Sequence, residues 1–294
     1  MPDAMPDERA LAFPCGGAWL YGILSLPDRS ATPHPRGVLI VVGGPQYRAG
    51  SHRQFTLLAR DLAAAGIPAM RFDYRGMGDS EGEPQNFENV DDDLRAAIDR
   101  FFAEVLGLQE VVLWGLCDGA SAAAMYAPQD PRVVGLVLLN PWVRTEAGAA
   151  RATINHYYKD RLFDARLWKK IARGQFDAAA SLRSLFQNVG KAFGAKAAVD
   201  AACAGTGADA NAPLPERMQA ALSRFGGRVL VILSGADLTA QEFAELTKRP
   251  GTWQRLISSA RFTGQQIDKA DHTFSRRPWQ DQVSGWTREW LRSW

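Results

Sequence analysis

The stretch VVLWGLCDGASA, Val111–Ala122, joins an apolar run to a Gly-x-Cys-x-Gly turn and then to a series of small residues. The apolar run predicts a buried strand, and the small residues predict the start of a helix. So sharp a turn forces its central residue into a strained backbone conformation, and we expect Gly115 and Gly119 to stand where side chains would not fit. Such a turn holds the thiol of Cys117 above the edge of a sheet. The N–H of Asp118 then lies at a helix N-terminus, where negative charge is stabilised.

Cys117 has two interpretations. A strand, a glycine-flanked turn and a helix in this order are typical of a nucleophile elbow, which predicts a catalytic thiol. A free cysteine also packs well as a small apolar side chain, so the alternative is a structural residue. The strand before the turn and the helix after it favour the nucleophile.

The composition of the 294 residues excludes several classes of protein. A formal net charge of +2 argues against nucleic acid as a partner. The cysteines Cys15, Cys117 and Cys203 are widely spaced and show neither a disulfide framework nor a zinc pattern. We expect no metal, no cofactor, no membrane span and no secretory signal, and hence a cytoplasmic location.

Apolar runs alternate with helical patterns, which predicts an α/β protein with a mostly parallel central sheet flanked by helices. Strands are expected at 11–13, 19–26, 37–42, 68–72, 110–114, 133–139, 228–233 and 260–267. Helices are expected at 55–65, 91–105, 121–126, 253–259 and 279–291.

Between residues 140 and 224 no convincing strand pattern occurs, and only helical segments are expected. We therefore predict a helical lid, residues 141–225, inserted between the sixth and seventh core strands. The core would comprise residues 1–140 and 226–294. Residues 144–196 hold eleven Lys or Arg and four Asp or Glu. This excess is explained either by a solvated helix surface or by attraction for an anionic substrate or carrier.

A cysteine nucleophile needs a base and a group that orients the base. His272 follows the last predicted strand and is the expected base, while Asp237 follows the strand before it and is the expected orienting acid. The order Cys117, Asp237, His272 is the one expected after a nucleophile elbow. Asp268 and Asp271 are the competing acids, with loop capping or surface exposure as their simpler roles.

An oxyanion hole requires a second N–H besides that of Asp118. The loop after the third strand contains Gly43, Gly44, Pro45 and Gln46. Because proline has no N–H, Gly44 is the preferred donor and Gln46 the second choice. The alternative is that these residues only form a turn.

Three further residues are candidates for substrate contact. His52 and Tyr47 lie on or just after the same loop and could face the mouth of a pocket, although a surface position at the start of a helix is the preferred explanation for His52. His156 lies in the predicted lid, where a helix face explains it as well as an acyl pocket does. The glycine-rich turn Asp73–Gly82 is expected to be structural.

The elbow, the Gly-Gly-Pro-Gln-Tyr loop at 43–47, the turn Asp73–Gly82 and the segment Ala270–Phe274 together resemble the α/β-hydrolases. More narrowly, the segment Gly-Gly-Pro-Gln-Tyr-Arg with Ser-His-Arg-Gln-Phe, and the Gly-Leu-Cys-Asp-Gly motif, resemble the exosortase A system-associated hydrolases. The resemblance covers nearly the whole chain. It implies the α/β-hydrolase fold and a cysteine nucleophile at Cys117. It also implies a gene that lies beside bacterial exopolysaccharide loci.

We therefore expect a hydrolase of an ester, thioester or related acyl compound, small or carrier-bound, that works through an acyl-enzyme. The same residues would also serve an acyltransferase. A catalytically silent binding protein with this fold is the third reading, and the sequence leaves the oligomeric state open.

Overall fold

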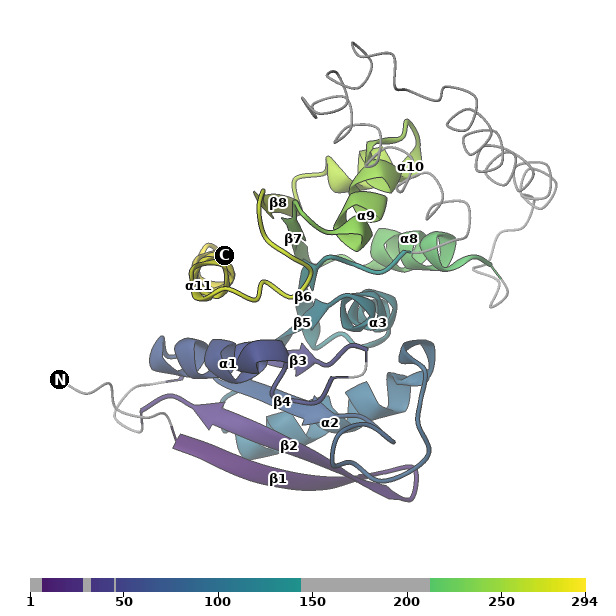
Figure 1. Ribbon diagram of the computed structural model, residues 1–294. Coiled ribbons are helices and arrows are strands. Elements are labelled where there is room, and N and C mark those ends of the chain that lie inside the picture. The colour runs from purple at the N-terminus through teal and green to yellow at the C-terminus, as the bar shows by residue number, and fades with distance from the viewer. Residues whose placement is uncertain (1–6, 29–32, 45, 144–211) are drawn as a thin grey trace, which may run out of the picture.

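The computed structural model describes residues 7–28, 33–44, 46–143 and 212–294, whose strands form one eight-stranded sheet (Figure 1). The strand order is β1-β2-β4-β3-β5-β6-β7-β8. Antiparallel pairing joins β1 to β2 and β2 to β4, and all other neighbours are parallel. The predicted mostly parallel sheet is thus confirmed. The strands are β1 Asp7–Cys15, β2 Ala18–Leu26, β3 Arg36–Val41, β4 Ala69–Asp73, β5 Glu110–Leu116, β6 Val133–Leu139, β7 Arg228–Ser234 and β8 Phe262–Ile267.

Helices cover both faces of the sheet. Figure 1 shows α11 and α3 on opposite sides of β5 and β6. Helix α1 packs against α11, and α8 packs against α3. The helices are α1 Gln54–Ala64, α2 Asp91–Glu104, α3 Asp118–Tyr126, α8 Leu214–Arg224, α9 Leu238–Lys248, α10 Thr252–Ile257 and α11 Arg277–Arg292, with short 3-10 turns at Ser51–Arg53, Phe87–Asn89 and Ala127–Gln129.

The strands at the centre of the sheet are almost completely buried, which accounts for their apolar sequences. Every residue of β3 is buried, and β5 and β6 each have one residue that is not. Strands covered on both faces need apolar residues throughout, so they appear in the sequence as continuous apolar runs. The observed bounds of these strands differ from the predicted ones by no more than two residues.

Helix α9 was missing from the sequence prediction, whereas α3 begins at Asp118, where the sequence analysis expected a helix N-terminus. The signal for α9 is Asp237, whose carboxylate accepts a hydrogen bond from the N–H of Ala240 at 2.9 Å as an N-cap.

Of the predicted lid, residues 141–225, the structure describes 141–143 and 212–225, and α8 lies in the second of these ranges. Residues 144–211, with His156 and Cys203, lie outside the described residues. In the described ranges, no helix combines the length and the apolar composition that crossing a bilayer requires.

Candidate active site

Cys117 stands between the end of β5 and the start of α3, with φ 59° and ψ −124°. A positive φ is rare for a residue other than glycine and is held here by the surrounding hydrogen bonds. The N–H of Cys117 donates to the carbonyl of Leu139 at 2.9 Å, and its carbonyl accepts from the N–H groups of Ala120 and Trp142 at 3.1 and 3.2 Å. The strained turn predicted from the sequence is therefore present.

The two flanking glycines stand where strand and helix approach each other most closely. A Cβ at Gly115 would lie 2.5 Å from the carbonyl carbon of Gly119, and a Cβ at Gly119 would lie 2.7 Å from the carbonyl oxygen of Val41. Real Cβ atoms are not found so close to backbone atoms. Both glycines are required by space, as the sequence analysis expected.

Asp237 and His272 meet beyond the ends of β7 and β8. The Nδ1 atom of His272 lies 3.0 Å from Oδ2 of Asp237, so the ring donates a hydrogen bond to the carboxylate. The Asp237 side chain is 11% exposed and the His272 side chain 34% exposed. The carboxylate is thus largely shielded, while the imidazole keeps access from outside.

His272 also contacts Cys117. The hydrogen bond with Asp237 and then the one with Cys117 raise the pKa of His272 to about 10, against the opposing effect of burial. Both neighbours therefore favour the protonated imidazole, which would in turn stabilise a thiolate beside it. The three residues that the sequence analysis selected lie in one hydrogen-bonded series.

Asn140 connects the loops that carry these side chains, and the sequence analysis missed it. Its Nδ2 donates to Oγ of Ser234 at 2.8 Å and to the carbonyl of His272 at 2.9 Å. Its Oδ1 accepts from the N–H of Ser234 at 2.9 Å. The residue is fully buried with φ 43°, a conformation that asparagine tolerates better than most residues. An asparagine directly after a buried strand was the available signal.

The two competing acids have other partners. The Asp271 carboxylate accepts hydrogen bonds from the N–H and hydroxyl of Ser275, and Asp268 accepts one from the side chain of Gln266 at 2.9 Å. Burial raises the pKa of Asp271, but its hydrogen bonds with Ser275 outweigh this and lower it. Loop capping, one of the two simpler roles considered, describes Asp271, and surface exposure, the other, describes Asp268.

His52 is exposed with φ 53°, and its electrostatic interaction contributes to lowering the pKa of Asp271, the neighbour of His272. Tyr47 is 53% exposed. The Oε1 atom of Gln46 accepts a hydrogen bond from the N–H of Ser51 at 3.2 Å, so this side chain holds its own loop together.

The carboxylate of Asp118 lies against the loop that was expected to form the oxyanion hole. It accepts a hydrogen bond from the N–H of Gly119 at 3.0 Å, and its Oδ1 occupies the space that a Cβ at Gly43 would need. Burial raises the pKa of Asp118, while the N–H of Gly44 and the charge of His272 act against that rise. The N–H of Gly44 is therefore engaged by a carboxylate in this structure.

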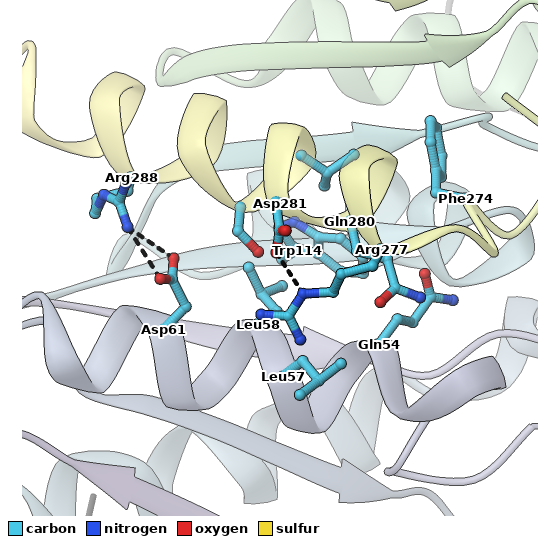
Figure 2. A pocket seen from close by; sticks show the side chains of 12 residues that line it. Gln54, Leu57, Leu58, Asp61, Trp114, Phe274, Arg277, Gln280, Asp281 and Arg288 are labelled. Atoms are coloured by element: carbon cyan, nitrogen blue, oxygen red, sulfur yellow. Dashed lines mark hydrogen bonds and ion pairs between the residues drawn. The ribbon is translucent and has the colours of Figure 1, made fainter. Parts of the chain in front are cut away.

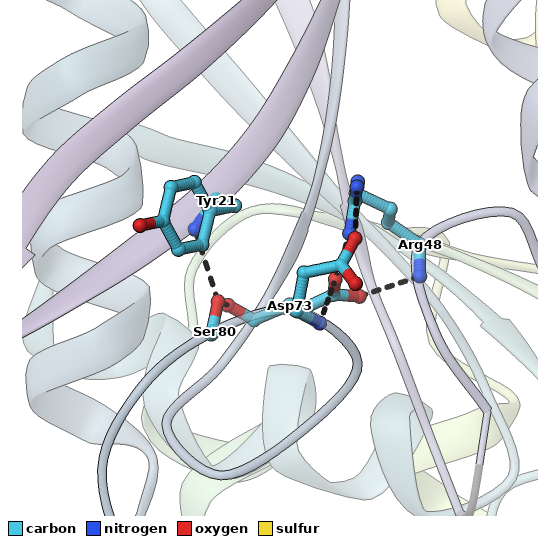
Figure 3. Close-up of polar contacts among 5 residues, drawn as sticks. Tyr21, Arg48, Asp73 and Ser80 are labelled. Carbon is cyan, nitrogen blue, oxygen red and sulfur yellow. Dashed lines mark hydrogen bonds and ion pairs between the residues drawn. The ribbon is translucent and has the colours of Figure 1, made fainter.

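A second polar cluster anchors the same loop to the end of β4 (Figure 3). The N–H of Arg48 donates to Oδ1 of Asp73 at 2.6 Å, and its guanidinium pairs with Asp73 and with Asp79. The hydroxyl of Ser80 donates to the carbonyl of Asp73 at 2.6 Å and accepts from the N–H of Tyr21 at 2.9 Å. The turn Asp73–Gly82 thus bonds to its surroundings as a structural element would.

In the described part of the chain, no group of three or more His, Cys, Asp or Glu side chains is placed to hold a metal ion. Cys15 is buried and unpaired, and burial raises its pKa.

Comparisons with known proteins agree with the fold. Residues 38–283 match the model of the alpha/beta hydrolase family. No curated protein matches the chain. Among solved structures, an esterase from Pyrococcus furiosus aligns with 12% identity and a TM-score of 0.63 over 98% of this chain and 93% of its own.

Two further structures are similar. Est1E from Butyrivibrio proteoclasticus, with ferulic acid bound, aligns with 14% identity and a TM-score of 0.60 over 96% of this chain and 98% of its own. A serine hydrolase without a lid from Xanthomonas campestris aligns with 16% identity and a TM-score of 0.56 over the whole of both chains. At these identities the likeness concerns the fold.

Proposed function

Because the chain belongs to the alpha/beta hydrolase family and has its fold, we propose that it hydrolyses an ester, a thioester or a related acyl compound. Cys117 is the nucleophile, His272 the acid and base, and Asp237 the group that orients the imidazole. The observation that carries the proposal is the series Cys117–His272–Asp237, assembled from the ends of three strands.

In the first step the Cys117 thiolate attacks the acyl carbon, and a C–S bond forms while the carbonyl π electrons move to oxygen. The tetrahedral intermediate collapses with cleavage of the bond to the leaving group, which takes the proton of the His272 imidazolium. Neutral His272 then removes a proton from water, which attacks the thioester. The carboxylic acid leaves, and the thiolate and imidazolium are restored.

The negative oxygen of each intermediate requires N–H donors. We assign this role to the N–H groups of Asp118 and Gly44, with that of Gln46 as the further candidate. The Asp118 carboxylate engages the N–H of Gly44 in the free protein, so the substrate carbonyl has to take its place.

The substrate class is supported by sequence alone. The basic segment 144–196 favours an anionic or carrier-bound acyl compound, and Tyr47, His52 and His156 are the candidate contacts. The motifs shared with exosortase A system-associated hydrolases favour a role linked to exopolysaccharide synthesis. Cytoplasmic location stays a prediction.

The test uses p-nitrophenyl acetate and butyrate with the full chain and with the variants Cys117→Ala and His272→Ala. We expect an acyl adduct on Cys117 by mass spectrometry, and loss of both adduct and turnover in the two variants. Cys15→Ala is the matched control and should keep activity. Turnover that survives Cys117→Ala, or an adduct on another cysteine, contradicts the proposal. Transfer of the acyl group to added alcohols or amines in preference to water would identify an acyltransferase instead.

A further inference from the structure

The two edges of the central sheet, β1 and β8, differ in their protection against pairing with another strand (Figure 1). An edge strand presents unpaired N–H and C=O groups, and charged residues or proline on the strand oppose its addition to another sheet. Strand β1 contains Asp7, Glu8, Arg9 and Pro14. The sequence of β8, Phe-Thr-Gly-Gln-Gln-Ile, contains no charged residue and no proline. Strand β8 is therefore the less protected edge.

The backbone of β8 presents hydrogen-bonding groups on the side away from β7. The carbonyls of Arg261 and Ile267 accept from N–H groups in and just after β7, at 2.8 and 2.9 Å. Because successive residues of a strand turn their backbone groups to alternate sides, Phe262, Gly264 and Gln266 direct theirs outward. Among these outward groups, only the N–H of Phe262 has a hydrogen-bond partner within the described residues. The others are available to a further strand.

The side chains of β8 leave room for such a strand. No residue of β8 is buried, and Thr263, Gly264 and Gln266 are exposed. A Cβ at Gly264 would meet nothing within 4 Å. A further strand therefore gains backbone hydrogen bonds at this edge without displacing a side chain of the described chain.

Strand β8 is complementary in charge to an antiparallel copy of itself. Arg261 precedes the strand and Asp268 follows it, so antiparallel pairing brings Arg261 of each copy beside Asp268 of the other. Outward residues pair with outward residues, and the register centred on Gly264 sets Arg261 opposite Ile267. A shift of two residues one way would set Arg261 opposite Lys269, a like charge. The opposite shift pairs fewer residues of β8, so the register centred on Gly264 is favoured.

Both charged side chains keep capacity for this contact. Arg261 donates one hydrogen bond to the carbonyl of Leu222 at 2.9 Å, and a guanidinium has five N–H donors. Asp268 is exposed and accepts one hydrogen bond, from the side chain of Gln266 at 2.9 Å.

The surface between α1 and α11 is less suited to a partner. A cavity of about 350 Å³ lies there (Figure 2). Its charged side chains pair with each other, Arg288 with Asp61 at 3.0 Å and Arg277 with Asp281 at 2.7 Å. These charges are satisfied within the chain, so charge complementarity favours β8 over this cavity.

We propose that two copies of this chain associate through β8, paired antiparallel about a two-fold axis at Gly264. The two eight-stranded sheets then become continuous. A second copy fits this edge because one strand supplies both halves of the pairing, in backbone groups and in charge. This inference does not depend on the proposed function, because none of the three candidate catalytic residues takes part.

The test is the mass of the full chain in solution, measured by light scattering after size-exclusion chromatography. We expect a dimer, with twice the chain mass of 32.2 kDa. Gly264→Lys sets two like charges opposite each other at the axis and should give the monomer. Gly285→Lys adds the same charge on α11, where a Cβ also meets nothing within 4 Å, and should leave the dimer intact. Asp268→Lys sets a cation beside Arg261 and should raise the dimer dissociation constant about tenfold.

A cross-link tests the position of the axis. The Cα atoms of a hydrogen-bonded antiparallel pair lie about 5.5 Å apart, which a disulfide can span. Mild oxidation should therefore cross-link Gly264→Cys, and neither the wild type nor Gly285→Cys.

The proposal is overturned if the wild type is a monomer at millimolar concentration. It is equally overturned if the dimer survives both Gly264→Lys and Asp268→Lys while circular dichroism shows the variants folded, or if Gly264→Cys fails to cross-link. Protection of the β8 amides from hydrogen exchange in a monomeric chain would assign this edge to a different occupant and overturn it too.

Discussion

The hydrogen bonds of His272 with Asp237 and Cys117 favour the protonated form of its ring. The resulting pKa of about 10 exceeds the value of about 6.5 expected in an unfolded chain. A group whose pKa is raised by folding stabilises the fold fully below its unfolded pKa. That contribution is lost as pH rises from about 6.5 through about 10.

Replacing Asp237 tests the origin of the raised pKa of His272. In Asp237→Asn the acceptor loses its negative charge, so the pKa of His272 should fall and the activity should drop. An NMR titration of the imidazole C–H signals measures the pKa. Asp268→Asn is the control, because Asp268 bonds to Gln266 and should leave the titration unchanged. Equal pKa values in wild type and Asp237→Asn would refute the assignment.

At the scale of elements, the close approach of β5, β3 and α3 leaves no room for a side chain at Gly119. We predict that Gly119→Ala lowers the free energy of unfolding by roughly 1–3 kcal/mol, because backbone must move to accept the methyl group. Gly285→Ala in α11, where a Cβ meets nothing within 4 Å, should raise it by roughly 0.5–1 kcal/mol. Urea unfolding of both variants measures the difference, and a destabilised Gly285→Ala would contradict this account.

The ends of β6, β7 and β8 are joined through Asn140. In Asn140→Ala the buried N–H of Ser234 loses its acceptor, and the carbonyl of His272 loses its donor. We expect a loss of roughly 1–3 kcal/mol in unfolding free energy and a larger loss of esterase activity than stability alone explains. Urea unfolding and p-nitrophenyl acetate turnover are compared in the same preparations. Full activity in Asn140→Ala would show that the loop carrying His272 does not need the hydrogen bonds of Asn140.

At the scale of the whole molecule, Arg36 connects the start of β3 to the end of the chain. Its guanidinium donates to the carbonyls of Leu291 and Trp294 at 3.1 and 3.0 Å and to Glu110 at 2.7 Å. It also lies 3.6 Å from the centre of the Trp294 ring. One buried cation thus ties α11, β3 and β5 together.

We predict that Arg36→Met destabilises the protein by roughly 1–3 kcal/mol, because two backbone carbonyls and a carboxylate lose their donor. Thermal unfolding measures the loss. Arg277→Met removes an exposed ion pair on α11 and should change stability far less. Similar effects of the two substitutions would mean that Arg36 is no more than a surface charge.

Much of this arrangement could be predicted from the sequence. Local features carried it: the glycines around Cys117, the continuous apolar runs of β3, β5 and β6, and the order in which Asp237 and His272 follow their strands. Each depends on neighbours along the chain, so periodicity and turn chemistry reveal it. Helix α9, which follows its N-cap Asp237, was the helix that the pattern did not reveal.

The alternation of strands and helices, and the position of a cysteine on a glycine-flanked turn, were determined by the chain's own order of residues. Only the tertiary structure decided that the carboxylate of Asp118 engages Gly44, that Asn140 ties His272 in place, and that β8 lies at an edge of the sheet. The physical reason is distance along the chain. Hydrogen bonds between residues far apart in sequence leave no periodic trace, and they exist only once the sheet has brought its strand ends and helices together.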